Sequence, residues 1–385
     1  YFRRGSSPYR NRWVAAMDWD PYRALYVHVP FCKRRCAYCD FSTCAVASDS
    51  PQLDNYVEGM IAAIRSASRF EQLGAIETVY FGGGTPTYLG NKRLSALLYT
   101  LSLSMHLTPE VECTIEANPD SLNESMVKDM FALGATRISI GVQSFDDGLL
   151  SFLGRIHSSD QAKRAVELAQ IRFDNVSIDL MCGLPGQTEE GFRRDLQSAL
   201  ELGVKHVSVY PLMIEEGTPL YQRVEQGTVL VDEDLGADLM QVASEVLGDA
   251  GMHRYEVASY AFDGFESRHN TAYWTGKPYL GLGEGAVSMR QNVLERERVK
   301  DGLVVESLDP FEMAAEDLML GMRMSRGISD SMLEDATLLL PDAPLAFREL
   351  ESDGLVSHCG SRWIPTEKGW LFGNRLYGRL FDLAP

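Results

Sequence analysis

The sequence lacks the features that would place it in a membrane, on nucleic acid or in a repeat array. No apolar run approaches the roughly eighteen residues that a membrane-spanning helix needs. No low-complexity segment or internal repeat stands out beyond a rhythm of short strands and helices. The formal net charge is −18, whereas a duplex-binding surface needs clustered Lys and Arg. We therefore expect a globular protein with no nucleic-acid partner.

Cysteine is scarce and unevenly placed. The chain has seven cysteines, and Cys32, Cys36 and Cys39 fall in one short segment. A small secreted scaffold held by disulfides would be shorter and more evenly cross-linked. The pattern therefore indicates a reducing compartment, and we expect the protein to be cytoplasmic.

The first residues do not have the pattern of a secretory signal. Residues 1–16 contain arginines but no acidic residue and no continuous apolar segment. We expect residues 1–19 to form a poorly ordered leader, in which Met17 would serve well as a start.

Short apolar runs alternate with longer amphipathic stretches from residue 24 to about 250. Each short run is rich in β-branched or aromatic residues and is bounded by polar or glycine-rich turns. This rhythm predicts an α/β fold with a parallel sheet, as an open doubly wound sheet or a full or partial barrel. The predicted strands are Ala24–Val29, Thr78–Phe81, Glu112–Glu116, Arg137–Val142, Asn175–Leu180 and His206–Tyr210.

Local signals mark several helix ends. Ser50 followed by Pro51 predicts a helix start, and the segment Ser121–Glu124 reads as a capping box. Gly134 and Gly203 stand where helices would need a left-handed residue after their last turn.

The pattern changes after about residue 250. Residues 254–260 predict one more strand, and residues 290–309 read as an exposed connection. From Pro310 onward, helical stretches precede a possible hairpin over 355–358 and 362–365, which predicts a winged-helix-like α+β module. We expect a core over 20–250, a bridging segment over 251–309 and a C-terminal domain over 310–385.

The strongest chemical signal is the loop that follows the first predicted strand. Cys32, Cys36 and Cys39 are separated by intervals of four and three residues. Such a loop can hold three corners of a [4Fe–4S] cluster and leave the fourth iron open to a chelating small molecule. The basic residues 33–35 would offset the cluster's negative charge and favour thiolates. The alternative is a zinc site, with Cys44 or His28 as the fourth ligand.

Further unusual residues follow the later strands. A glycine triplet, residues 82–84, comes directly after the second strand and can bring backbone N–H groups close to a ligand. Glu116, Gln143 and Asp179 stand at the ends of the next three strands. Each alone is as compatible with a structural role as with a functional one. Together they predict one polar rim, because chemistry gathers at the carboxyl ends of parallel strands.

These motifs resemble the radical S-adenosylmethionine (SAM) superfamily. The resemblance rests on Cys-x3-Cys-x2-Cys after the first strand and Gly-Gly-Thr-Pro after the second, and it runs from about residue 24 to the C-terminus. Within the superfamily the chain is most similar to oxygen-independent coproporphyrinogen III oxidases and HemW-type heme chaperones. The matching segments are 26–32, 81–87, 140–145, 153–157 and 179–185.

The resemblance implies a partial (β/α)6 TIM-like barrel with a C-terminal winged-helix-like α+β module. It also implies a [4Fe–4S] cluster on the three cysteines, to which SAM is chelated and from which one electron can cleave the C5′–S bond of SAM. Carried over by position, the expected SAM-binding residues are Tyr26, Tyr38, Gly83, Gly84, Thr85, Glu116, Gln143, Arg155, Asp179 and, more weakly, Met213.

Position 41 favours one branch of this subgroup. The oxidases carry a fourth cysteine two residues after the third, and this chain has Phe41 there, as HemW-type chaperones do. A second shared motif runs from His269 to Trp274, where an imidazole and aromatic rings suit heme. The alternative for His269 is a hydrogen-bonded histidine beside an aromatic core. Relatives usually have His where this chain has Val287.

The resemblance therefore implies a heme chaperone that passes heme to an acceptor such as a respiratory-chain hemoprotein. An electron donor such as flavodoxin or ferredoxin, and membrane contact only through the acceptor, are implied with it. The alternative is a coproporphyrinogen III oxidase (dehydrogenase) or another radical SAM enzyme in porphyrin biosynthesis. The C-terminal module could act as a lid, a docking surface or a plain scaffold.

Overall fold

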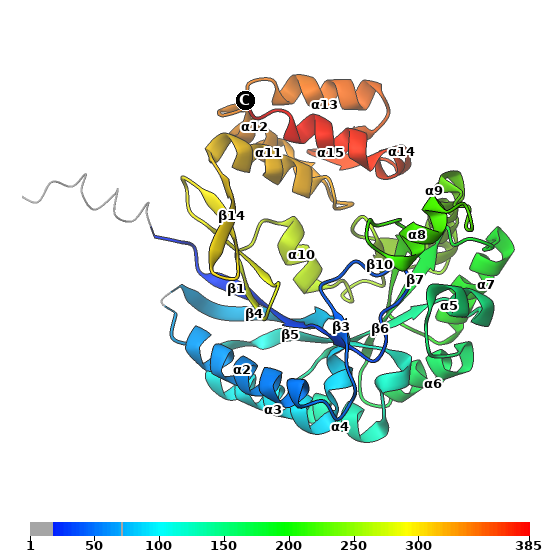
Figure 1. The fold of residues 1–385 in the computed structure, drawn as a ribbon. Helices are drawn as coiled ribbons and strands as arrows, with labels where there is room; N and C mark the ends of the chain where they lie inside the picture. Colours follow the sequence, from blue (N-terminus) through cyan, green and yellow to red (C-terminus); the bar gives the residue numbers. More distant parts are fainter. Residues whose placement is uncertain (1–17, 71) are drawn as a thin grey trace, which may run out of the picture.

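The fold is built on one large mixed sheet (Figure 1). A computed structural model describes residues 18–70 and 72–385. The 12-stranded sheet has the order β14-β13-β12-β11-β1-β4-β5-β6-β7-β8-β10-β9. Its central parallel strands are β1 (Tyr22–Val29), β4 (Leu73–Gly83), β5 (Leu107–Ala117), β6 (Arg137–Gln143), β7 (Asn175–Cys182) and β8 (His206–Pro211).

The order of these strands decides between the two predicted architectures. Each central strand pairs with the next one along the chain, so the winding never reverses as it does in a doubly wound sheet. Right-handed crossovers then place the connecting helices on one face, and the sheet curves into a partial barrel. The predicted partial-barrel fold is confirmed. The helices are α2 (Pro51–Ala67), α3 (Asn91–Ser104), α4 (Glu124–Ala132), α5 (Asp147–Leu153), α6 (Ser159–Gln170), α7 (Glu189–Glu201), α8 (Pro219–Glu225) and α9 (Glu233–Asp249).

All six predicted central strands are present, and most extend beyond their predicted ends. Ser50 caps α2 by accepting a hydrogen bond from Gln52 N, and Gly203 takes a left-handed conformation after α7, as predicted. The predicted capping box over Ser121–Glu124 is wrong. Asn123 caps α4 instead, because Ser121 is already used in a short 3-10 turn with Asn118.

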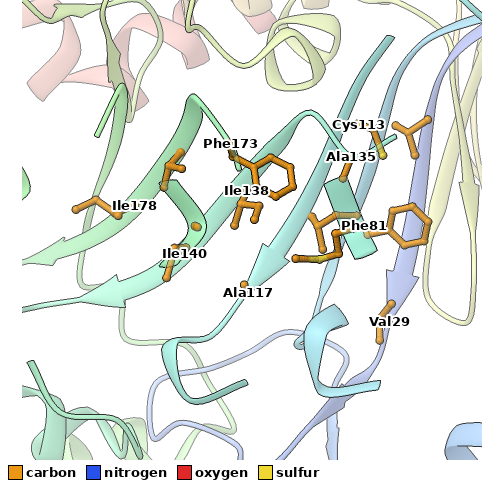
Figure 2. Packing of buried hydrophobic residues seen from close by; sticks show 14 of the residues in the cluster. Val29, Phe81, Cys113, Ala117, Ala135, Ile138, Ile140, Phe173 and Ile178 are labelled. Atoms are coloured by element: carbon orange, nitrogen blue, oxygen red, sulfur yellow. The ribbon is translucent and has the colours of Figure 1, made fainter. Parts of the chain in front are cut away.

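The main core lies between the sheet and its helices (Figure 2). Side chains alternate between the two faces of a strand. On β6, Ile138, Ile140 and Val142 join this apolar cluster. Residues 137, 139, 141 and 143 therefore project to the opposite face, into the barrel interior. The apolar outer face fixes the register, and the register fixes which polar side chains line the interior.

The region after residue 250 departs from prediction. The predicted strand over 254–260 is two short strands, β9 (His253–Arg254) and β10 (Ser259–Ala261), joined by a turn. The prediction of an exposed connection over 290–309 is wrong, because β12 (Val287–Gln291), β13 (Arg296–Lys300) and β14 (Leu303–Leu308) extend the sheet beyond β11 (Tyr279–Leu282). Helix α10 (Arg268–Trp274) lies between these two groups of strands.

The C-terminal residues form a module with a core of its own. The predicted hairpin is present as β16 (Val356–Cys359) and β17 (Arg362–Pro365), with β15 (Ile328–Ser329) as a third strand. This combination of helices and a small antiparallel sheet has the predicted winged-helix-like character. The helices are α11 (Pro310–Gly321), α12 (Asp330–Thr337), α13 (Ala343–Ser352), α14 (Glu367–Leu371) and α15 (Gly373–Phe381).

Within the described ranges, no helix has the length and apolar character required to cross a bilayer. Of the predicted leader over 1–19, residues 1–17 lie outside the described part of the chain.

Candidate functional site

The cysteine loop begins where β1 ends. A short strand β2 (Phe31–Cys32) pairs in parallel with β3 (Cys44–Ala45), which closes the loop at its base. The loop is also tied to α5, because the backbone N–H of Ala37 donates to the carbonyl of Leu153 over 2.9 Å. These backbone contacts hold the three cysteine side chains, all half-buried, toward the barrel mouth.

Two side chains from elsewhere in the barrel contact the thiols. The Thr85 hydroxyl donates to Cys32 Sγ over 3.6 Å, and Arg155 Nη1 donates to Cys36 Sγ over 3.5 Å. Burial raises the pKa of the Cys32 thiol to about 11. At this thiol, removal from water outweighs the positive charge of Arg155.

The three thiols line one small cavity, which we call the cysteine cavity. Its volume is about 130 Å³. Its wall brings together residues that are far apart in the sequence, as the polar-rim hypothesis predicted. Of the predicted site residues, Cys32, Cys36, Cys39, Tyr38, Gly83, Gly84, Thr85, Glu116, Gln143, Arg155 and Asp179 line it.

A second cavity, here the barrel cavity, adjoins the first. Its volume is about 360 Å³, and it shares Cys39, Glu116 and Asp179 with the cysteine cavity. Met213 lines only this second cavity and is 66% exposed. Among the described residues that line the two cavities Tyr26 is absent. Its side chain lies on the interior face of β1, opposite Leu25 and Val27 of the core, and its hydroxyl is hydrogen-bonded to His28 Nδ1 at 2.9 Å.

The glycine triplet provides a close backbone approach to the cysteine cavity. Gly83 has a φ of 105°, and a Cβ there would lie 2.4 Å from the His28 ring. A Cβ on Gly84 would lie 2.7 Å from the carbonyl oxygen of Phe31. Only glycine fits at these two positions, so the sequence signal had a steric cause.

Two half-buried carboxyls face both cavities. Glu116 accepts a 2.7 Å hydrogen bond from the Tyr80 hydroxyl and a 3.2 Å hydrogen bond from Gly83 N. Asp179 accepts a 3.4 Å hydrogen bond from Ser139. Burial raises the pKa of Glu116 to about 7 and that of Asp179 to about 6. In its ionised form, each carboxyl can accept hydrogen bonds from ligand hydroxyls.

Gln143 and Arg155 complete the rim. Gln143 has a φ of 72°, a left-handed conformation that is uncommon outside glycine, and the register of β6 against β7 shifts just before it. This irregularity turns its side chain into the cavities. Arg155 follows a left-handed Gly154 and donates from Nη2 to Asn118 Oδ1 over 2.8 Å. Both residues are thus positioned by specific backbone geometry.

Several lining residues were missed at the sequence level. Asn118 connects Thr85 and Arg155, donating to the former and accepting from the latter. Its place two residues after Glu116 was a usable signal. Arg137, Tyr210 and Asn270 line the barrel cavity but stand in ordinary strand or helix contexts, where a single sequence provides no warning.

The geometry bears on the choice between zinc and an iron–sulfur cluster. Three thiolates on one zinc ion at about 2.3 Å would be separated by about 3.8 Å. Among residues 18–70 and 72–385, the one group of three candidate ligands within 4.8 Å of one another is His253, Asp263 and Glu266. At least one pair of the three cysteine sulfurs is therefore more than 4.8 Å apart, which is wider than three ligands of one zinc ion would be.

Neither predicted fourth zinc ligand is available at this site. His28 is hydrogen-bonded through Nδ1 to Tyr26 and through Nε2 to the Ser42 carbonyl at 3.0 Å. Cys44 is exposed and does not line the cysteine cavity. The residues present thus fit a three-thiolate cluster better than a four-ligand zinc ion.

His269 is a satisfied core histidine in this structure. It is 1% exposed, and its ring nitrogens are hydrogen-bonded to Thr78 Oγ1 at 2.9 Å and to the Tyr273 hydroxyl at 3.0 Å. Burial lowers its pKa to about 3. Asn270, the next residue of the motif, faces the barrel cavity instead. A ligand in the barrel cavity would therefore contact the 269–274 motif through Asn270.

A larger cavity of about 510 Å³ lies between α10 and the C-terminal module. None of the cysteines lines it, and its lining includes exposed side chains such as Arg268 and Arg326. We therefore identify the two cavities at the barrel mouth as the candidate site.

Comparison with known proteins places the chain in a family. Residues 26–199 match the Radical SAM superfamily, and residues 308–372 match the HemN C-terminal domain. The heme chaperone HemW of Bacillus subtilis is 31% identical, with 92% of this chain and 98% of that protein covered. HemW of Escherichia coli is 33% identical, with 92% and 97% covered.

A solved structure supports the same fold. Coproporphyrinogen III oxidase (HemN) from Escherichia coli has a TM-score of 0.80 to this chain, 20% sequence identity, and coverage of 96% of this chain and 93% of that one. At this identity the likeness concerns the fold. The sequence relatives define the narrower group, and the chain belongs to the HemW-type branch of the radical SAM superfamily.

Proposed function

We propose that this chain is a heme chaperone, which binds a [4Fe–4S] cluster, SAM and heme and passes heme to an acceptor protein in the cytoplasm. One observation carries the proposal: three thiols and a ring of polar groups line one cavity, while position 41, at the same cavity, is a phenylalanine. In the oxidases a cysteine stands at that position. The HemW relatives, matched over nearly their whole length, support the same reading.

Specific residues would hold each cofactor. Cys32, Cys36 and Cys39 would ligate three irons, and the cluster would supply one electron and an open coordination site when bound. The backbone of Gly83 and Gly84 allows close approach of SAM. Glu116 and Asp179 would accept hydrogen bonds from its hydroxyls, and Tyr38, Thr85, Gln143 and Arg155 would orient it. Met213 would contact it from the barrel cavity, whereas Tyr26 would act only through neighbours such as His28.

Phe41 is suited to a cargo with an apolar face. Its ring is 62% exposed and lines both cavities, so it offers an apolar face to a ligand there. A porphyrin ring would cover it. A flavodoxin- or ferredoxin-type donor would reduce the cluster, and a respiratory-chain hemoprotein is the type of acceptor that we propose.

The deciding experiment compares heme binding with porphyrinogen oxidation. The protein is reconstituted anaerobically and titrated with heme, and a Soret band with saturable binding is expected. In parallel it is given coproporphyrinogen III, a reductant and SAM, and the products are followed together with 5′-deoxyadenosine. SAM-dependent formation of protoporphyrinogen IX would falsify the chaperone proposal in favour of the oxidase alternative.

A second measurement addresses transfer. The heme-loaded protein is mixed with increasing amounts of a heme-free b-type cytochrome or, as a control sink, apomyoglobin. Direct transfer requires a rate that rises with cytochrome concentration and exceeds the rate to apomyoglobin. Equal rates that do not depend on the sink would indicate simple dissociation and contradict a chaperone role.

A further inference from the structure

Arg137 is a buried cation in the barrel interior. It is the first residue of β6 and projects to the interior face, opposite the apolar side of the strand. Gln143, at the rim, is six residues further along the same strand, which corresponds to about 20 Å of backbone. Arg137 therefore starts from the deep end of the barrel, and it lines the barrel cavity together with Asn270.

The guanidinium of Arg137 is not fully satisfied by the protein. The residue is only 2% exposed, and its Nε has no hydrogen-bond partner among the described residues. Arg296 is also 2% exposed, but its guanidinium forms ion pairs with Glu316 at 2.6 Å and with Asp317 at 2.7 Å. A buried charge whose donors are incompletely paired is costly. A retained buried arginine of this kind therefore points to an anion that is absent from the protein itself.

The nearby carboxyls are not the close partner of Arg137. Glu116 and Asp179 line the same cavity, but each already accepts hydrogen bonds from other groups, Tyr80 and Gly83 for the first and Ser139 for the second. A close ion pair with Arg137 would depress the pKa of a carboxyl. Burial instead raises both, and the charge of Arg137 offsets this only in part.

The histidines around Arg137 do not add to its positive charge. His206 and His269 are buried, and burial, followed by the charge of Arg137, lowers the pKa of each. Both are therefore neutral near pH 7. Arg137 is thus the cation that lines the deep end of the barrel cavity, and the amide of Asn270 lines the same cavity.

The rest of the cavity is suited to an apolar body with an acidic arm. Phe41, Met181 and Met213 contribute aromatic and thioether surface, while Arg137 provides a forked donor for a carboxylate. We propose that Arg137 binds a propionate carboxylate of the tetrapyrrole cargo in the barrel cavity. This inference rests on the proposed function, because it takes heme as the ligand.

The test compares heme with heme dimethyl ester, in which both propionates lose their charge. A charge-assisted hydrogen bond to a buried arginine contributes about 2 kcal/mol, or roughly thirtyfold in affinity. The wild-type protein should therefore bind heme at least about tenfold more tightly than the ester. The Arg137→Gln variant should lose this preference and bind both ligands with the wild type's ester affinity, and Arg137→Lys should retain part of it.

Controls separate this role from a structural one. Arg254→Gln removes another largely enclosed arginine, stacked on Trp370 and outside the barrel cavity, and should keep the wild-type preference for heme. Cluster absorbance and SAM affinity of Arg137→Lys should match the wild type. If Arg137→Gln does not fold, the wild-type ligand comparison and Arg137→Lys still decide the question.

The outcomes are distinguishable. If the wild type binds heme and its ester equally, or if Arg137→Gln keeps the preference, the propionate assignment fails while the chaperone proposal stands. If the Arg137 variants lose SAM affinity but keep the preference for heme, Arg137 belongs to the cofactor and the assignment is likewise overturned. If the wild type binds no heme at all, the proposed function itself fails.

Discussion

The Tyr80 hydroxyl donates a 2.7 Å hydrogen bond to Glu116 at the wall shared by the two cavities. Together with Gly83 N it fixes the orientation of the carboxyl, yet burial still raises the pKa of Glu116 to about 7. A group that holds a ligand by accepting hydrogen bonds is therefore only partly ionised at neutral pH. This relationship makes the site sensitive to pH.

The first prediction concerns SAM affinity. If ribose hydroxyls donate to Glu116, binding favours the ionised carboxylate, so affinity should increase several-fold as pH rises from about 6 to about 8. Calorimetric titration of the reconstituted protein at several pH values measures this. In Glu116→Gln the residue no longer titrates, and most of the pH dependence should disappear. A wild-type affinity that is flat over this range would contradict the assignment.

The second prediction concerns the stability of the protein without SAM. The folded-state pKa values of Glu116 and Asp179 are raised, so the folded protein binds more protons than the unfolded chain between their ordinary and their raised values. The free energy of unfolding should therefore decrease from about pH 4.5 to about pH 7, by on the order of 1–3 kcal/mol. Denaturant unfolding at both ends of this window tests it. The Glu116→Gln/Asp179→Asn variant should show a smaller decrease than the wild type.

The third prediction concerns the cluster ligands. Replacing Cys32, Cys36 or Cys39 by alanine should abolish the visible absorbance of the reconstituted cluster, because each removes one of three thiolates on the same cavity. Cys44→Ala is the matched control, since this exposed cysteine lies outside the cavity and should be dispensable. Iron and sulfide analysis accompanies the spectra. Cluster loss in the Cys44 variant alone would overturn the ligand assignment.

The fourth prediction concerns Gly83. Alanine here would combine a positive φ with a Cβ 2.4 Å from the His28 ring, so we expect a loss of stability of about 1–3 kcal/mol and weaker SAM binding. Gly90→Ala is a useful control, because it has a φ of 82° but no atom within 4 Å of the added Cβ. Thermal unfolding and SAM titration compare the two. Equal effects would mean that backbone conformation, not close approach, explains the glycine.

The fifth prediction concerns attachment of the C-terminal module. Arg296 on β13 is buried and pairs with Glu316 and Asp317 of α11. Arg296→Met leaves Glu316 buried with Arg298 as its remaining partner, and should lower the free energy of unfolding by about 3 kcal/mol. Adding Glu316→Met should restore part of this loss in the same denaturant experiment. If the double variant is as unstable as the sum of the two single variants, the pair is not coupled.

The sequence predicted the barrel well and the segment after it poorly. The central strands can be predicted because their buried apolar residues, such as Ile138, Ile140 and Val142, form a pattern within a few consecutive positions. Strands β12 to β14 show no such pattern. Their buried positions include Arg296, whose charge is paired with acidic residues of α11. A polar, charged segment reads as exposed until its distant partners are known.

By itself, the sequence determined the cysteine loop, the glycines that allow close backbone approach, and the alternation of strands and helices. Each of these depends on residues that are close together in the chain. The tertiary structure alone decided which polar groups meet. It directs the Tyr26 hydroxyl to His28, satisfies both nitrogens of His269, and leaves the buried Nε of Arg137 without a hydrogen-bond partner among the described residues. These outcomes depend on strand register and on removal from water, both of which are set by contacts between distant segments.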